Sequence, residues 1–301
     1  MIIKTTGRIA DDFYILGQHN FPTHLLMGRK PALFEAGLAC LGSVYVNAIR
    51  SMLAQTQPAF LFLNHLHFDH CGATAYIKEA FPDMEICASE RGRAIIQRPN
   101  AVKTIAMLSR EVYSWVEAQS PGLAEETPFE AFDVDQVLAD GDRIEIDRNL
   151  TVHVLATPGH TWYALSYYIP EKKLLLAGES GGIMDPTGFF FAEFLVDYES
   201  YLNSMERLAA LDVDILSQSH HQVFTGEDAR SFFPRSIKAA HQFKDQVENL
   251  LDRENGDIEK VVSLIKAEEY DPKPDPKQPE PAYLINLEAR VRHLAGRRQP
   301  F

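Results

Sequence analysis

The chain has 301 residues, enough for one large domain or two ordinary ones with a substantial core. Hydrophobic residues make up 46% of it and charged residues 24%, which excludes fibrous and disordered classes. The net charge of -13 disfavours nucleic acid and anionic lipid as partners, because their phosphates repel an acidic protein.

Two further features favour a cytoplasmic protein. The residues from Met1 to Asp12 lack the apolar stretch of a secretory signal, and no later run approaches the ~20 apolar residues of a membrane-spanning helix. The three cysteines, Cys40, Cys71 and Cys87, form no Cys-x-x-Cys pair and are odd in number, which suits a reducing compartment. We therefore expect a cytoplasmic protein with no membrane partner and no nucleic-acid partner.

The first part of the chain alternates strands with helices. Apolar stretches broken by turn residues predict a β-meander over 13–33, and helical spacing follows at 43–55. Residues 59–63 form a continuous apolar run, typical of a strand buried on both faces. A short helix at 71–80 and a strand at 85–88 then give a βαβ unit.

The middle of the chain is predicted as a helical insertion followed by a second β-rich half. Residues 89–132 carry helical spacing and then a loop rich in Pro, Gly and Glu. A helix at 198–210 and a strand at 213–216 close the second half, and from residue 226 the pattern is helical except for a proline-rich loop at 271–281. Five short strands are expected between the insertion and that helix, at 136–139, 143–146, 151–155, 164–169 and 173–177.

Three imidazoles and a carboxylate follow directly on the predicted strand at 59–63. They belong to His65, His67, Asp69 and His70. Imidazole nitrogens and carboxylate oxygens are the usual ligands of zinc and also suit iron and manganese. An accidental polar loop is the alternative, but histidine is scarce and such a run rarely arises for packing.

Three more candidate ligands follow predicted strands. His160 comes after Gly159, Glu179 comes after Gly178, and Ser219 is followed by two histidines. Candidate ligands thus follow four predicted strands, and an accidental polar loop would not explain this pattern. The sequence therefore predicts a metal centre assembled at the ends of strands.

In order and composition these motifs resemble the metallo-β-lactamase superfamily, over roughly residues 10–225. The resemblance implies an α/β fold, an αββα sandwich of two mixed β-sheets flanked by helices. It also implies a catalytic domain at 1–225, with the insertion at 89–132, and a helical extension at 226–301 that caps the site. Two divalent metal ions are implied, zinc or iron with manganese as a third option, one held by His65, His67 and His160 and the other by Asp69, His70 and His220.

The chain departs from the family pattern at Glu179, where the family usually places a bridging aspartate. Glu179 either bridges the two ions or only supports a ligand, and some iron-containing branches tolerate glutamate here. His221 could replace His220 as ligand, although the register of the following residues favours His220. The arrangement of the helices further resembles one branch, the thioesterase-like hydrolases of alkylquinolone signalling.

The resemblance implies hydrolysis of an acyl bond in a thioester, ester or lactone by a metal-bridging hydroxide, with Asp69 as the catalytic carboxylate. An iron-dependent, oxygenase-like redox enzyme is an alternative motivated by Glu179, and a regulatory protein acting through its helical surface is another. The expected partner is a small-molecule acyl substrate, and a homodimer is compatible with the sequence. Phe190, Glu193 and Phe194 either line the substrate pocket or seal their loop against the core.

Overall fold

Two seven-stranded mixed sheets dominate the computed structural model, which describes residues 1–275 and 277–297. The chain packs into two compact units that interleave along the sequence. Unit 1 contains both large sheets and consists of Met1–Ala156, Tyr163–Gly178 and Leu211–Arg230. Unit 2 contains a two-stranded hairpin and consists of Thr157–Trp162, Glu179–Ala210 and Ser231–Phe301. The predicted extension at 226–301 and the predicted loop at 271–281 include 298–301 and Pro276, which lie outside the described residues.

The N-terminal sheet of unit 1 has the strand order β2-β3-β4-β5-β6-β7-β8. Its first four strands pair antiparallel, and β3 to β5 among them lie in the meander predicted over 13–33. Strands β5 to β8 pair parallel because helices connect them. The strands are β2 (Gly7–Ala10), β3 (Phe13–Gln18), β4 (Phe21–Leu26), β5 (Ala32–Phe34), β6 (Phe60–Phe62), β7 (Glu85–Ser89) and β8 (Gln136–Leu138).

The second sheet of unit 1 has the order β1-β16-β15-β12-β11-β10-β9. Only β12 and β15 pair parallel in this sheet, and the other neighbours are antiparallel. Its strands are β1 (Ile2–Ile3), β9 (Arg143–Asp147), β10 (Leu150–Ala156), β11 (Leu165–Ile169), β12 (Leu174–Leu176), β15 (Ile215–Ser217) and β16 (Val223–Thr225).

An apolar layer joins the two sheets of unit 1 face to face. Side chains alternate between the faces of a strand, so Phe60 and Phe62 enter this layer while Leu61 faces the other way. The rings of Phe34 and Phe62 stack with centroids 5.1 Å apart, and Tyr167 of the second sheet lies 5.2 Å from Phe62. This layer fixes the ends of β5, β6 and β11 with respect to one another.

Helices cover the other face of the N-terminal sheet, where Leu61 packs with Tyr45 and Ile77 in a second apolar cluster. Because both faces of β6 are buried, its sequence is apolar throughout, as predicted. The helices of unit 1 are α1 (Gly42–Leu53), α2 (Phe68–Cys71), α3 (Thr74–Ala80), α4 (Glu90–Ile96), α5 (Pro99–Gln119) and α7 (Glu227–Arg230).

The helix predicted at 71–80 begins later than expected: α3 spans Thr74–Ala80, and the separate helix α2 ends at Cys71, just before Gly72. The Gly72 N–H donates to the carbonyl oxygen of Gly37 at 2.8 Å rather than continuing the helix. A Cβ on Gly72 would lie 2.5 Å from the backbone nitrogen of Ala39, so only glycine permits this approach. The contact brings the chain beyond β5 against α2.

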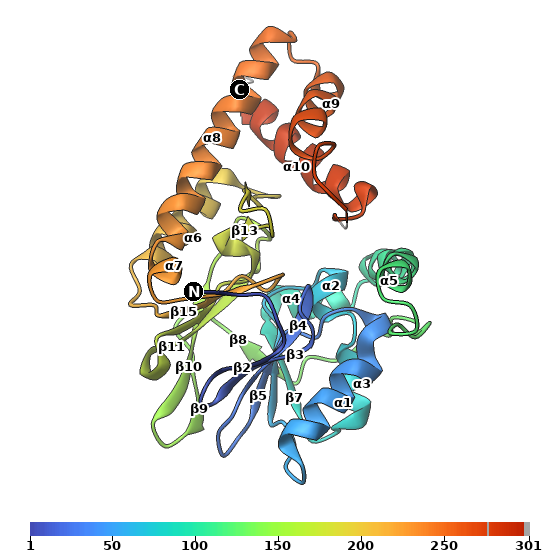
Figure 1. The fold of residues 1–301 in the computed structure, drawn as a ribbon, viewed down its shortest axis with the longest axis vertical. Helices are drawn as coiled ribbons and strands as arrows, with labels where there is room; N and C mark the ends of the chain where they lie inside the picture. The colour runs from blue at the N-terminus through green and yellow to red at the C-terminus, as the bar shows by residue number, and fades with distance from the viewer. Residues whose placement is uncertain (276, 298–301) are drawn as a thin grey trace. The chain divides into compact units, whose positions relative to one another are not determined.

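Unit 2 is mainly helical, and Figure 1 shows its long helices α8 and α10 in orange and red. Asp197 and Asp257 cap α6 and α9 by accepting hydrogen bonds from backbone N–H groups of the first turn. The elements are β13 (Ile183–Met184), β14 (Phe190–Phe191), α6 (Tyr198–Ala209), α8 (Phe232–Arg253), α9 (Ile258–Glu269) and α10 (Glu280–Arg297).

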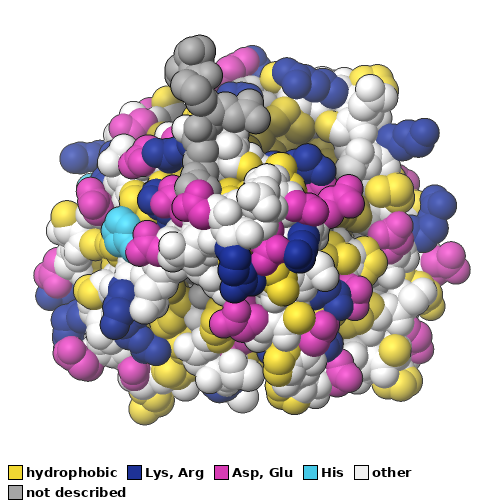
Figure 2. Space-filling view, turned by 90° about the horizontal axis from the view of Figure 1, so that it is seen from above, with side chains coloured by type: hydrophobic (Ala, Val, Ile, Leu, Met, Phe, Trp, Pro, Cys, Tyr) yellow, Lys and Arg dark blue, Asp and Glu magenta, His cyan; other side chains and the backbone are white. Residues whose placement is uncertain are grey.

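The prediction of two mixed sheets flanked by helices is confirmed. Strands β1, β2, β13, β14 and β16 were not predicted. Of these, β1, β13 and β14 have two residues each, too few to show a period of two. No helix in the described part of the chain is long and apolar enough to cross a bilayer. Acidic and basic side chains are interspersed on the face seen in Figure 2.

Candidate metal centre

The end of β6 is held rigidly in unit 1 by Asn64. Its side-chain amide donates to the carbonyl oxygen of Leu165 at 2.6 Å, and the Leu165 N–H donates to the Asn64 carbonyl oxygen at 2.9 Å. Asn64 is 2% exposed and directly precedes His65. The histidine run therefore begins at a point that is fixed to both sheets.

The three histidine rings that follow β6 converge. The ring of His65 lies 4.5 Å from that of His67 and 4.1 Å from that of His70, between centroids. His67 precedes α2 in extended conformation, and its carbonyl oxygen accepts the His70 N–H at 3.0 Å. This one turn of helix presents Asp69 and His70 beside the first two histidines.

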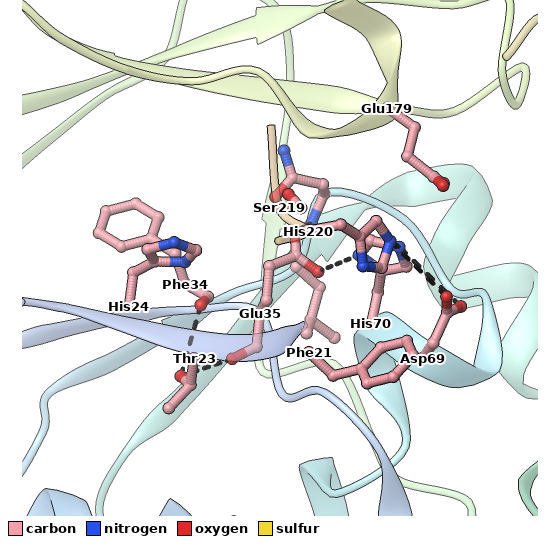
Figure 3. Close-up of polar contacts among 12 residues, drawn as sticks. Phe21, Thr23, His24, Phe34, Glu35, Asp69, His70, Glu179, Ser219 and His220 are labelled. Atoms are coloured by element: carbon pink, nitrogen blue, oxygen red, sulfur yellow. Dashed lines mark hydrogen bonds and ion pairs between the residues drawn. The ribbon is translucent and has the colours of Figure 1, made fainter. Parts of the chain in front are cut away.

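Glu35 was not predicted as a site residue, yet it contacts the cluster directly. The Nδ1–H of His70 donates to Oε2 of Glu35 at 2.8 Å (Figure 3), and Oε1 of Glu35 accepts the backbone N–H of Asn64 at 3.3 Å. Burial raises the pKa of Glu35, although the neighbouring His70 opposes the rise. The available signal was a charged residue directly after the apolar strand β5, the same signal that singled out the other motifs.

Asp69, His70 and His220 bring three donor atoms together. The two Nε2 atoms of the histidines are 3.1 Å apart, and the Asp69 oxygens lie 3.9 Å from Nε2 of His70 and 3.7 Å from Nε2 of His220. His220 donates its Nδ1–H to the carbonyl oxygen of Asn20 at 3.0 Å. With both Nδ1 atoms donating, neutral imidazoles direct two lone pairs at each other beside a carboxylate, so a divalent cation fits this donor set.

Unit 2 holds the other two predicted ligands. His160 is 1% exposed, and its Nε2 lies 2.6 Å from Oε2 of Glu179, while its Nδ1–H donates to the carbonyl oxygen of Glu193 at 2.7 Å. Burial lowers the pKa of His160, but the carboxylates of Glu179 and Glu193 outweigh it, and the net change is upward. With Nδ1 bonded to a backbone carbonyl, a metal ion bound in place of the proton between Nε2 and Oε2 would have these two atoms as ligands.

The loop carrying His160 depends on Gly159, whose φ is 133°. A Cβ there would lie 2.4 Å from Cα of Tyr201. The Gly159 carbonyl oxygen accepts the N–H groups of Leu195 and Val196, both at 3.1 Å. The glycine thus lets the loop dock against α6 and the segment before it.

Of the remaining candidates, Glu193 contacts His160 through its backbone carbonyl oxygen. His221 donates its Nδ1–H to Oδ1 of Asn20 at 2.9 Å, so of the two neighbouring histidines it is His220 that faces Asp69 and His70. Phe190 packs on Phe232 at 5.2 Å, and Phe194 is fully buried. A substrate-binding role for Phe190, Glu193 and Phe194 stays a prediction.

The chain belongs to the metallo-beta-lactamase superfamily, because its residues 53–220 match the sequence profile of that family. It is 30% identical over 122 residues to glyoxylase B2 of Dictyostelium discoideum, covering 40% of this chain and 35% of that protein. It is 28% identical over 162 residues to a hydroxyacylglutathione hydrolase of Bartonella tribocorum, covering 54% of this chain and 48% of that protein. The matches thus span less than half the length of these curated relatives.

Solved structures share the fold. A metallo-beta-lactamase family protein from Thermus thermophilus superposes with a TM-score of 0.64 at 21% identity, over 97% of this chain and 94% of the other. Similarity at this identity establishes the architecture. Together with the family match, it confirms the metallo-β-lactamase fold that the motifs predicted. The family match and the similarity to a hydroxyacylglutathione hydrolase support a metal-dependent hydrolase.

Proposed function

We propose that this protein hydrolyses acyl thioesters with two divalent metal ions. The observation that carries the proposal is the convergence of Asp69, His70 and His220, whose candidate ligand atoms all lie within 4.8 Å of one another. The proposed ligands are His65, His67, His160, Asp69, His70, His220 and Glu179.

The proposal joins the ligands of unit 1 with the His160 and Glu179 pair of unit 2. Their order along the chain supports it, since it is the order of the superfamily's ligands. Chain connectivity supports it as well. His160 belongs to the short segment Thr157–Trp162 between the paired strands β10 and β11, and Glu179 directly follows Gly178, which packs on Asn64.

Divalent metals of this kind supply a water nucleophile at neutral pH and polarise an acyl carbonyl. The chain's own residues handle protons and orientation. The side chain of Asp69 is 18% exposed, so its carboxylate can accept a proton from the attacking water and pass it to the departing thiolate. Glu35 and the Asn20 carbonyl keep the protons of His70 and His220 on Nδ1, so that the lone pairs of both Nε2 atoms would be directed at the metal.

The names of the similar proteins support a thioester as substrate. A hydroxyacylglutathione hydrolase acts on an acyl group attached to the glutathione sulfur, and its match of 162 residues is longer than the 122 residues matched by glyoxylase B2. We therefore propose a small acyl thioester over an ester or a lactone. We also propose that the protein acts in the cytoplasm and that its helical extension covers the site.

Replacement of Asp69 tests the proposal. Asp69→Asn keeps the size of the side chain but removes the charge and the proton acceptor, so we expect hydrolysis of hydroxyacyl-glutathione and acyl-coenzyme A thioesters to fall by ~100-fold or more. The matched control is Asp83→Asn, at an exposed position. Equal turnover by the two variants would remove Asp69 from the mechanism, and the absence of turnover by wild-type protein on any thioester would refute the substrate class.

Glu179 favours a second candidate, an iron-dependent redox enzyme, because glutamate stands where the family usually has aspartate. Oxygen uptake by the iron-loaded protein distinguishes the two. We expect thioester cleavage without oxygen consumption, and uptake that is stoichiometric with product would favour the redox enzyme.

A further inference from the structure

The loop that carries His220 has an unfavourable backbone conformation on both sides of this residue. Ser219 has a φ of 72° and His221 a φ of 59°, in the left-handed region where residues other than glycine and asparagine are seldom found. Such a conformation persists only where surrounding contacts enforce it. The loop also closes on itself, because the carbonyl oxygen of His220 accepts the N–H of Gln222 at 2.6 Å and the side-chain amide of Gln218 at 3.0 Å.

The turn between β3 and β4 supplies the enforcing contacts through one residue, Asn20. Its carbonyl oxygen accepts the Nδ1–H of His220 at 3.0 Å, and its side-chain oxygen accepts the Nδ1–H of His221 at 2.9 Å. The turn itself is stiff, since Oε1 of Gln18 accepts the backbone N–H groups of Asn20 and Phe21 at 2.7 and 3.2 Å. Asn20 therefore holds two adjacent histidines from a fixed point.

Phe21, the first residue of β4, restricts the His220 ring from another side. Its ring packs edge-on against the His220 imidazole, with centroids 5.6 Å apart. Figure 3 shows Phe21, His220, His70 and Asp69 in one group. The His220 ring is thus bounded by a hydrogen bond, an aromatic side chain and the two partners of the candidate metal centre.

We infer that Asn20 and His221 form a positioning pair, in which the side-chain hydrogen bond between them holds the left-handed backbone at His221 and thereby aims Nε2 of His220 at the metal. The inference rests on the proposed role of His220 as a ligand. It gives His221 a function without making it a ligand, and it gives the side chain of Asn20 a role that no motif in the sequence indicates.

A double-mutant cycle on zinc affinity tests the pair. Asn20→Ala removes the side-chain acceptor and keeps the backbone carbonyl, while His221→Gly removes the imidazole and suits the left-handed φ. We expect each change to weaken binding of one of two zinc ions on the order of 10- to 100-fold, as for other residues that orient ligands. Both single variants delete the same hydrogen bond. The double variant should therefore bind zinc no more weakly than the single variant with the lower zinc affinity.

Two further variants control for flexibility and folding. Ser219→Gly introduces the same glycine freedom on the other side of His220 without removing the hydrogen bond, so it should bind zinc as wild-type protein does. Asn20→Asp keeps an oxygen acceptor and should restore affinity relative to Asn20→Ala. Zinc binding is measured by competition with a chelating dye, together with thermal unfolding of the metal-free proteins, which a positioning role leaves nearly unchanged.

Each outcome decides the inference. Additive losses, unaltered affinity in His221→Gly, or equal losses in Ser219→Gly and His221→Gly would overturn it. Complete loss of one zinc ion from His221→Gly would also overturn it, because His221 would then be a ligand. Wild-type protein that binds no zinc, iron or manganese would instead refute the proposed function together with the inference, and the assay separates these failures because it needs no substrate.

Discussion

Glu35 is a fully buried carboxylate whose one strong partner is the imidazole of His70. Burial raises its pKa, so ionised Glu35 is costly in the metal-free protein. Its benefit lies in holding the proton of His70 on Nδ1. We predict that Glu35→Gln lowers metal affinity by about 10- to 100-fold while the metal-free protein unfolds at the same or a higher temperature.

A chelator competition assay and a thermal melt of the metal-free protein check this prediction together. Lower melting with unchanged affinity would show that Glu35 serves folding rather than the metal. The control is Glu85→Gln, an exposed residue of β7.

Glu179 is the residue whose role in metal binding is most open. If it binds both ions, Glu179→Gln should lower metal content clearly, since a neutral amide replaces an anionic donor shared by two cations. Its contact with Nε2 of His160, at 2.6 Å, favours this outcome. The measurement is metal content of protein purified without chelator. Full occupancy with near-normal rates would place Glu179 outside the ligand set.

The sequence predicts the parts of the candidate site where several histidines and carboxylates cluster. It does not predict the residues that contribute singly from other parts of the chain. The run from His65 to His70 is dense enough to recognise in sequence, and His160 and His220 follow strands in the same way. Glu35 stands alone between apolar neighbours, so only its position after a strand sets it apart. Asn20 carries no signal at all, because its contacts with His220 and His221 join residues 200 and 201 positions away.

At the scale of elements, the β13–β14 hairpin of unit 2 is fixed by one carboxylate. Oδ1 of Asp185 accepts the backbone N–H groups of Thr187 and Phe189 at 2.8 and 3.1 Å, and Oδ2 pairs with Lys273. The ammonium of Lys273 lies 3.9 Å from the ring centroid of Phe191. This contact joins the hairpin to the loop between α9 and α10.

Asp185→Asn should therefore destabilise the protein by roughly 1–3 kcal/mol at neutral pH, because Lys273 is left without its anionic partner. Burial raises the pKa of Asp185, but the hydrogen bonds from Lys273 and Thr187 outweigh it and hold the pKa below the usual 3.8. A carboxyl group whose pKa is lower in the folded protein than in the unfolded protein stabilises the fold at pH values above its unfolded pKa. This stability is lost as the pH falls through its folded pKa.

Denaturant unfolding at several pH values measures the effect. The difference in free energy of unfolding between wild-type protein and Asp185→Asn should be constant above about pH 5 and shrink below pH 3.8. A difference that grew on acidification would contradict the assigned ion pair. Asp83→Asn, at an exposed position, serves as the control.

Elements with long patterns were predictable, and short or interrupted ones were not. Strand β6 shows an unbroken apolar run because it is buried on both faces, and α8 shows its apolar residues at helical spacing. The break between α2 and α3 depends on the contact of Gly72 with Gly37, which no local pattern reveals. The hairpin of β13 and β14 is too short to show alternation.

At the scale of the whole molecule, the two units interleave, whereas the sequence suggests contiguous segments at 1–225 and 226–301. The segment Thr157–Trp162 belongs to unit 2 because its carbonyl groups accept hydrogen bonds from that unit, such as the one from Ser204 to Pro158 at 2.7 Å. So short an excursion between two strands resembles an ordinary loop in sequence. Whether the C-terminal helices form a separate folding domain stays a prediction.

The most direct test of a dinuclear thioester hydrolase is a titration of metal-free protein with zinc or iron(II), in which bound metal and thioester hydrolysis are followed together. We predict no hydrolysis without metal, rising activity with added metal, and a plateau at two equivalents per chain, all abolished in Asp69→Asn. Thioester hydrolysis at the full rate by metal-free protein, or binding that never exceeds one equivalent, would contradict the account.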